Sequence, residues 1–144
     1  MKGEIIRQLN FTGSNVSVRA SCPAGRQWRL ISGEAVCVTD ATVATRYYGI
    51  EALDADAGAV IWCGGYQSQA ASITNKVELG GGPPSTGLLG STRQFISVPA
   101  DPICFGGDMV GITIGSGQAG DSVVMRLRIA ESAGVPPAVT AITP

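Results

Sequence analysis

Short segments in which apolar and polar side chains alternate dominate this chain, and breaks rich in Gly, Pro, Asp or Ser separate them. Alternation with a period of two indicates a half-buried β-strand, because successive side chains point to opposite faces of a sheet. The clearest case is residues 123–130, where Met125 and Leu127 alternate with Arg126 and Arg128. The same pattern predicts strands over residues 16–20, 27–38, 45–53, 60–63, 73–79, 94–98, 103–105, 109–114 and 123–130.

Glycine and aspartate mark the breaks within and between these segments. Gly33 interrupts the run 27–38 and predicts a bulge or a bend there. Residues 54–58 carry Asp54 and Asp56, an arrangement that resembles the start of a calcium loop but lacks the later acidic ligand. We therefore interpret them as a turn, and residues 80–87, rich in Gly and Pro, as an exposed loop.

Eight or nine short strands with almost no helical periodicity predict an all-β fold. At this length we expect a two-sheet antiparallel β-sandwich, jelly-roll-like, with extended N- and C-terminal arms. The sandwich domain spans 14–131, residues 1–13 form an N-terminal arm or first strand, and residues 132–144 form an extended arm. Three prolines in that last segment exclude both a helix and a central strand. It is either a frayed terminus or an arm that becomes ordered on a neighbouring subunit.

Composition removes the commonest kinds of catalysis. The 144 residues include no histidine, which excludes a Ser-His-Asp or Cys-His nucleophile and any imidazole metal ligand. We predict no catalytic residue, no cofactor and no metal, and therefore no enzyme. Paired carboxylates such as Glu51 and Glu78 keep an acid-pair glycosidase as a remote alternative.

The charge pattern argues against nucleic acid and membrane as partners. Ten basic and eleven acidic residues give a net charge of −1, and no basic block stands out. The longest apolar runs, such as 59–63, are far shorter than the roughly 20 residues of a membrane helix. Only 15% of the residues are charged, which suggests that partners cover part of the surface.

Cysteine and tryptophan are interpreted as core residues. We expect the four cysteines to be reduced and structural, with Cys37, Cys63 and Cys104 in apolar stretches, while a disulfide or a metal site remains an alternative. Trp28 and Trp62 also lie in apolar runs, so we expect burial rather than an exposed platform for sugar stacking.

Several segments share an order of motifs with a known family. Gly-Arg-Gln-Trp at 25–28 is followed by Ala-Thr-Val at 41–43 with Arg46, and then by an Asp-containing turn leading to Val-Ile-Trp at 60–62. Residues 99–101 and 121–128 match the end of the same pattern. Over about residues 25–130 the chain resembles small jelly-roll structural proteins, of the cement or decoration kind, from tailed bacteriophages. The resemblance implies a virion component and carries over no catalytic residue.

Together these features predict a non-enzymatic capsid cement protein that binds the outer capsid between capsomers and stabilises the head. Its partners would be the major capsid protein and copies of itself, with a trimer favoured, and it would be made in the host cytoplasm. A neck, tail or baseplate adaptor and a glycan-binding module are the alternatives. Candidate interface residues are Ile5, Arg7, Phe11, Arg46, Arg93, Val135, Pro136, Pro137, Val139 and Ile142.

Overall fold

The computed structural model describes residues 3–13, 17–55, 60–80, 86–88 and 93–134. This part of the chain contains strands and no helix. The strands are β1 (Ile5–Gly13), β2 (Val18–Ser21), β3 (Arg26–Val38), β4 (Arg46–Leu53), β5 (Val60–Gln69), β6 (Thr74–Gly80), β7 (Thr86–Leu88), β8 (Arg93–Ser97), β9 (Cys104–Phe105), β10 (Met109–Gly115) and β11 (Ser122–Ala133).

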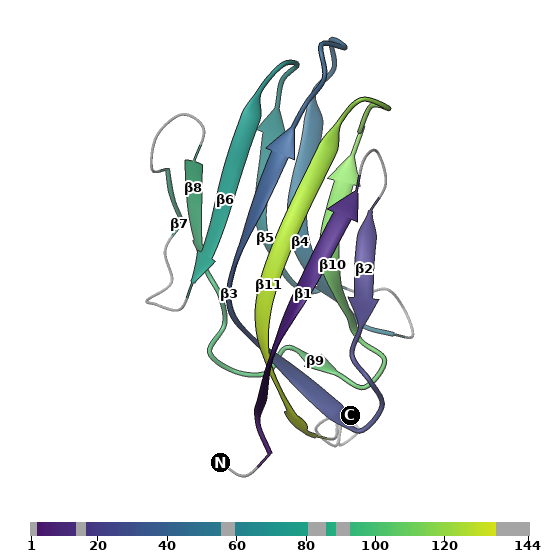
Figure 1. The fold of residues 1–144 in the computed structure, drawn as a ribbon, viewed down its shortest axis with the longest axis vertical. Coiled ribbons are helices and arrows are strands. Elements are labelled where there is room, and N and C mark those ends of the chain that lie inside the picture. The colour runs from purple at the N-terminus through teal and green to yellow at the C-terminus, as the bar shows by residue number, and fades with distance from the viewer. Residues whose placement is uncertain (1–2, 14–16, 56–59, 81–85, 89–92, 135–144) are drawn as a thin grey trace, which may run out of the picture.

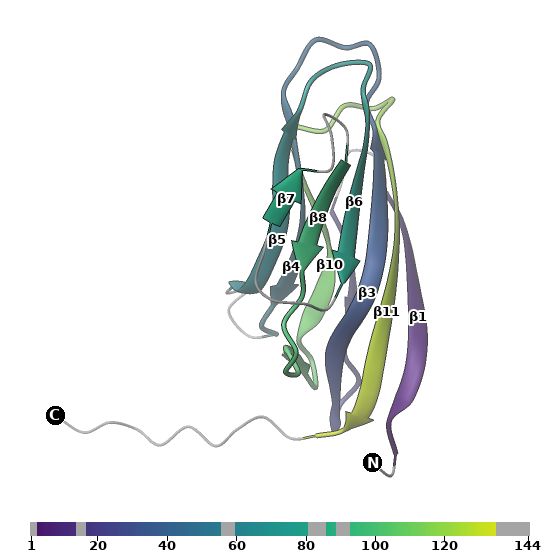
Figure 2. The same ribbon diagram turned by 90° about the vertical axis from the view of Figure 1, so that its left-hand side faces the viewer.

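Two sheets pack face to face, as the side view shows (Figures 1 and 2). The large sheet has the strand order β1-β11-β3-β6-β8-β7, with β9 added to one end of β3. The small sheet has the order β2-β10-β4-β5. The pair β6 and β8 is parallel, and the other pairs are antiparallel. The predicted all-β sandwich is thereby confirmed.

The strand pairing follows a jelly roll once β7, β8 and β9 are treated as an insertion. Of the other eight strands, the first pairs with the last, β1 with β11, and the second with the seventh, β2 with β10. The two inner pairs are β3 with β6 and β4 with β5. This is a long antiparallel ribbon rolled into two sheets, and the further pairs β11 with β3 and β10 with β4 complete each sheet.

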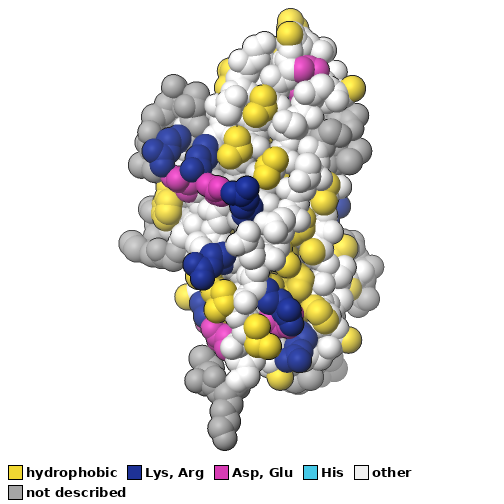
Figure 3. Space-filling view, in the orientation of Figure 1, with side chains coloured by type: hydrophobic (Ala, Val, Ile, Leu, Met, Phe, Trp, Pro, Cys, Tyr) yellow, Lys and Arg dark blue, Asp and Glu magenta, His cyan; other side chains and the backbone are white. Residues whose placement is uncertain are grey.

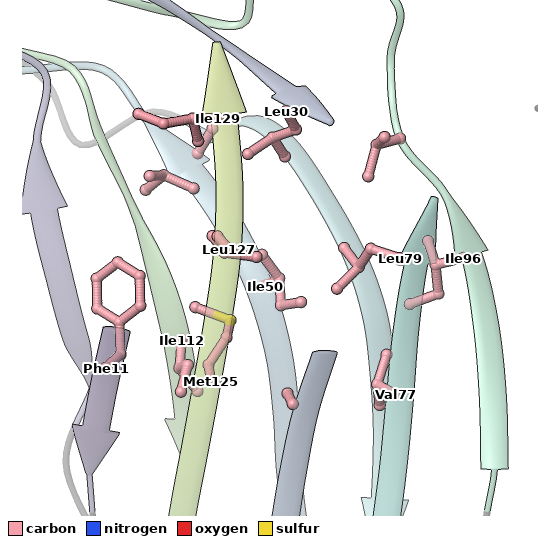
Figure 4. Packing of buried hydrophobic residues seen from close by; sticks show 14 of the residues in the cluster. Phe11, Leu30, Ile50, Val77, Leu79, Ile96, Ile112, Met125, Leu127 and Ile129 are labelled. Atoms are coloured by element: carbon pink, nitrogen blue, oxygen red, sulfur yellow. The ribbon is translucent and has the colours of Figure 1, made fainter. Parts of the chain in front are cut away.

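The core lies between the sheets, and apolar side chains from both inner faces meet there (Figure 4). Trp28 is buried within it and Trp62 packs against it while partly exposed, so the core interpretation of Trp28 is confirmed. Labelled side chains of the cluster are Phe11, Leu30, Ile50, Val77, Leu79, Ile96, Ile112, Met125, Leu127 and Ile129.

The C-terminal end of the sandwich differs from the sequence-based boundary. At the N-terminal end, residues 5–13 form the first strand, one of the two predicted alternatives, since β1 pairs with β11 from Ile5 to Gly13. At the other end β11 continues to Ala133, which pairs with Arg26, so an extended arm cannot begin at residue 132. Regular pairing persists there because β3 begins at Arg26 and offers partners along its whole length.

Gly33 has a different role from the predicted bulge. The register shift in the β11–β3 pair leaves Ile31 unpaired, two residues before Gly33. Gly33 instead faces Leu127, and a Cβ atom at residue 33 would lie 2.6 Å from Leu127 Cδ2. The glycine therefore allows the two strands to approach closely.

Three of the four cysteines are buried, but not the three that the sequence indicated. Cys22, Cys37 and Cys104 lie in the core, whereas Cys63 is exposed on the edge strand β5. Burial raises the pKa of Cys22 to about 11 and the pKa values of Cys37 and Cys104 to about 12. The predicted burial of Cys63 is wrong, because alternate side chains of a strand in a sandwich point away from the core towards solvent. Residues 56–58 of the predicted turn and 81–85 of the predicted loop lie outside the described residues.

Candidate interaction surface

The side of the large sheet that faces away from the core forms a broad surface, here called the outer face. Strand alternation sends Arg126 and Arg128 of β11 to this face while Met125 and Leu127 point into the core. Pairing then sets Arg126 opposite Glu34 of β3. The outer face therefore combines side chains from β1, β11, β3, β6 and β8.

Five charged side chains of alternating sign cross the outer face, and we call them the charge ladder: Arg93, Glu78, Lys76, Glu34 and Arg126. Arg93 Nη2 lies 2.7 Å from Glu78 Oε2, and Lys76 Nζ lies 3.3 Å from Glu78 Oε1. Lys76 Nζ is also 3.0 Å from Glu34 Oε2, and Arg126 Nη1 is 3.6 Å from Glu34 Oε1. Figure 3 shows acidic and basic side chains next to one another across this face.

The ion pairs of the ladder shift the pKa values of Glu78 and Lys76 towards the charged form. The hydrogen bond from Arg93 lowers the pKa of Glu78, with Lys76 adding to the effect. The hydrogen bond to Glu34 raises the pKa of Lys76, and Glu78 acts in the same direction. Because these pairs are solvent-exposed, they add little to folding stability and can exchange their partners for those of another protein.

A shallow hollow of about 340 Å³ lies beside the ladder. Small residues make its floor, since Ser32 and Gly33 stand between longer side chains of the neighbouring strands. Arg128 lines it and has no ion-pair partner among the described residues. A guanidinium free on an open surface is suited to a carboxylate of a partner protein.

An apolar patch of three valines adjoins the ladder. Val36 on β3 pairs with Val124 on β11 and with Lys76 on β6, which places it beside the middle member of the ladder. Val38 and Val124 are 39% and 42% exposed. A patch of aliphatic side chains next to arginines matches the composition of a protein–protein contact better than that of a small-molecule site.

Strand β1 borders the outer face and exposes two isoleucines. Ile5 and Ile6 are 46% and 50% exposed. Arg7 is half exposed, and its Nε donates to Glu131 Oε1 at 2.9 Å, while Trp28 Nε1 donates to Glu131 Oε2 at 2.8 Å. The bond from Trp28, with that from Arg7, lowers the pKa of the buried Glu131.

The predicted interface residues fall into three groups. Ile5 and Arg7 on β1 and Arg93 on β8 lie at the surface, and Arg93 belongs to the charge ladder. Phe11 is buried in the core, so its assignment to an interface is wrong. The five residues of the tail lie outside the described residues: Val135, Pro136, Pro137, Val139 and Ile142.

Arg46 is also wrongly assigned, because it is wholly buried. Its Nε donates to Asp121 Oδ2 at 2.9 Å and its Nη2 to Asp40 Oδ1 at 2.6 Å. Its Nη1 donates to the carbonyl oxygens of Thr42 and Ala44, and Nη2 also reaches Asp121 Oδ1 at 3.1 Å. All five N–H groups of the guanidinium therefore donate within the chain. They connect the loop before β4 to the loop before β11, and no N–H group remains for a partner protein.

The sequence missed most of the charge ladder and the hollow. The alternation in 123–130 already placed Arg126 and Arg128 on the polar side of a strand, which was the available signal. Glu34, Lys76 and Glu78 become neighbours only through the register of β3 and β6, and single-strand patterns do not contain that register.

No protein-family model matches the chain, and no curated protein sequence matches it significantly. No helix in the described part of the chain is long and apolar enough to span a membrane. Among the described residues, no three Cys, Asp or Glu side chains are grouped so that they could hold a metal ion.

Proposed function

We propose that this chain is a non-enzymatic virion structural protein, a capsid cement or decoration protein that binds the outer capsid surface between capsomers. The observation that carries the proposal is the outer face, where the charge ladder, Arg128 and the valine patch lie together on paired strands. The buried centre of a specific protein contact is more apolar than its rim, and arginine is enriched in such contacts. The sequence resemblance to phage decoration proteins supports the same conclusion.

In this proposal the outer face docks on the major capsid protein. The ladder orients the approach, since charged groups at a contact mainly set its register and its association rate. Arg126 and Arg128 exchange water or an exposed partner for carboxylates of the capsid, and Val38 and Val124 lose their exposed area. The paired strands hold these side chains in fixed positions, so little ordering is required on binding.

Stabilisation of the head would come from several contacts acting together. A specific contact buries about 800 Å² on each partner. A homo-oligomer, a trimer in our proposal, would present several outer faces to neighbouring capsomers at once. After the first contact the others become intramolecular, so the assembly resists outward pressure better than single contacts would.

The test is binding of purified protein to capsids that lack it, scored as bound copies per capsid and as the temperature at which particles release DNA. Arg128→Glu should raise the protein concentration needed for half occupancy of the capsid about tenfold, a cost of about 1.4 kcal/mol, because it reverses a charge at the contact. Arg126→Gln should have a smaller effect in the same direction.

Arg19→Gln is the matched control. Arg19 lies on the small sheet and forms an ion pair with Glu51 at 3.6 Å, the same length as the pair of Arg126 with Glu34. The control should bind like the natural protein. Unchanged binding of both outer-face variants would remove this face from the contact, and a copy number matching a single ring would favour the adaptor alternative.

A further inference from the structure

The free edge of β1 differs from the three other sheet edges of the molecule. The edge strand β2 has four residues and β7 has three, which limits any pairing with another chain. The edge strand β5 is longer, but its pairing with β4 contains two register shifts. By contrast, β1 pairs with β11 in nine consecutive pairs without a shift. Short edge strands and bulges protect a sheet from unwanted strand addition, but β1 is neither short nor bulged.

The N-terminal half of β1 is also suited to pairing with a further strand. It contains no proline or lysine, and its one charge, Arg7, already binds Glu131. Ile5 and Ile6 are exposed there. In the part of the chain that the structure describes, no strand pairs with the outer edge of β1, and Figure 1 shows β2 beside only its C-terminal half. A long, regular, apolar edge of this kind is expected to be covered in the working assembly.

We propose that residues 138–143 of a second copy of this chain add to the edge of β1 as an extra strand. These residues read Ala-Val-Thr-Ala-Ile-Thr, with no charge and no proline, and four of them are β-branched. Six residues of extended chain span about 20 Å, which matches residues 5–10 of β1. Pro136, Pro137 and Pro144 bound the segment and limit the strand to this length.

The position of the end of β11 indicates that the tail pairs with β1 of a second copy rather than with β1 of its own chain. Ile5 pairs with Glu131, so β11 ends beside the start of β1, on the side opposite to the free edge. To reach the free edge of β1 in its own molecule, the tail would have to cross the start of β1 and then immediately run back in the direction opposite to β11. Two consecutive prolines favour an extended path instead. If each copy donates one tail and accepts another, exchange between two copies gives a twofold dimer, and head-to-tail exchange gives a ring when the rotation closes.

Hydrogen exchange of the isolated protein tests the proposal without any capsid. In the full chain the amides of residues 5–10 that point away from β11 should exchange at least about tenfold more slowly than in a chain ending at Gly134. A synthetic peptide of residues 135–144, added to the shortened chain, should restore the protection. Native mass spectrometry should show an oligomer for the full chain and a monomer for the shortened one.

A matched pair of point variants separates pairing from the mere presence of a tail. Thr140→Pro removes a backbone donor and should abolish both the protection and the oligomer, whereas Thr140→Val keeps the donor and the β-branch and should retain both. Equal exchange of β1 in the full and shortened chains would overturn the inference. So would protection of β5 instead of β1, or protection of β1 in a monomer. Failure here would leave capsid binding by the outer face untouched, because the two experiments use different partners.

Discussion

Arg46 and Asp121 form a fully buried ion pair across the fold, with Arg46 Nε 2.9 Å from Asp121 Oδ2. Asp121 also accepts hydrogen bonds from the backbone N–H groups of Asp40 and Gln118 and from the hydroxyl of Tyr48. The pair therefore ties the loop before β4 to the loop before β11. Two charges without solvent are stable only when their hydrogen bonds are made, and here they are.

Acid should destabilise the fold through Asp121. Burial by itself would raise the pKa of Asp121, but the hydrogen bonds from Arg46, the two backbone groups and Tyr48 lower it from 3.8 to about 2. A lowered pKa in the folded state means that stability is present above pH 4 and is lost as the pH falls towards 2. The expected loss is about 2 kcal/mol, measured by urea unfolding across that range. In Asp121→Asn, a pH dependence as steep as that of the natural protein would contradict this account.

Removal of the buried cation should cost far more than removal of an exposed one. Arg46→Met leaves Asp121 and Asp40 without their partner, and we expect a loss of about 3 to 5 kcal/mol in the free energy of unfolding. Arg93→Gln breaks a pair of similar length at the surface, 2.7 Å from Glu78, and should cost under about 1 kcal/mol. Similar losses for the two variants would show that Arg46 is not the buried anchor described here.

Gly33→Ala should destabilise the sandwich. The added Cβ would meet Leu127 Cδ2 at 2.6 Å and the carbonyl oxygen of Arg126 at 2.7 Å, so the strands would have to separate. We expect a loss of about 1 to 3 kcal/mol by thermal unfolding. Gly115→Ala is the control, because its nearest contact would be Tyr47 Cβ at an ordinary 3.5 Å. Equal stability of Gly33→Ala and the natural protein would argue against the close approach.

The cysteines should differ sharply in reactivity. Cys63 is exposed, whereas burial raises the pKa values of Cys22, Cys37 and Cys104. A thiol reagent at pH 8 should therefore modify one cysteine quickly in the native protein and all four after unfolding. Cys63→Ser should abolish the fast phase. Fewer than four reactive thiols in the unfolded, unreduced protein would indicate a disulfide.

Strand positions were accessible from the sequence because alternation is a local property. The predicted run 109–114 became β10 (Met109–Gly115), and 27–38 became β3 (Arg26–Val38). Strand β7 (Thr86–Leu88) was not predicted, since it is short and begins within a segment rich in Gly and Pro.

The role of a charged residue was harder to predict than the position of a strand. Arg46 and Arg93 both occur among polar residues of a strand. They differ in their surroundings in the folded protein, since Arg46 is buried against Asp121 and Arg93 pairs with Glu78 at the surface. Asp121 lies 75 residues away in sequence from Arg46, so nothing local indicates that the guanidinium is buried. The assignment of Phe11 to an interface is wrong for a similar reason, because only the pairing of β1 with the distant strand β11 packs this side chain into the core.

The most direct test of the proposed function is an image reconstruction of virions that carry the protein. The account predicts jelly-roll density on the outer capsid surface between capsomers, with the strands β1, β11, β3 and β6 facing the shell. Density confined to the neck, tail or baseplate, or absence of the protein from purified particles, would contradict it.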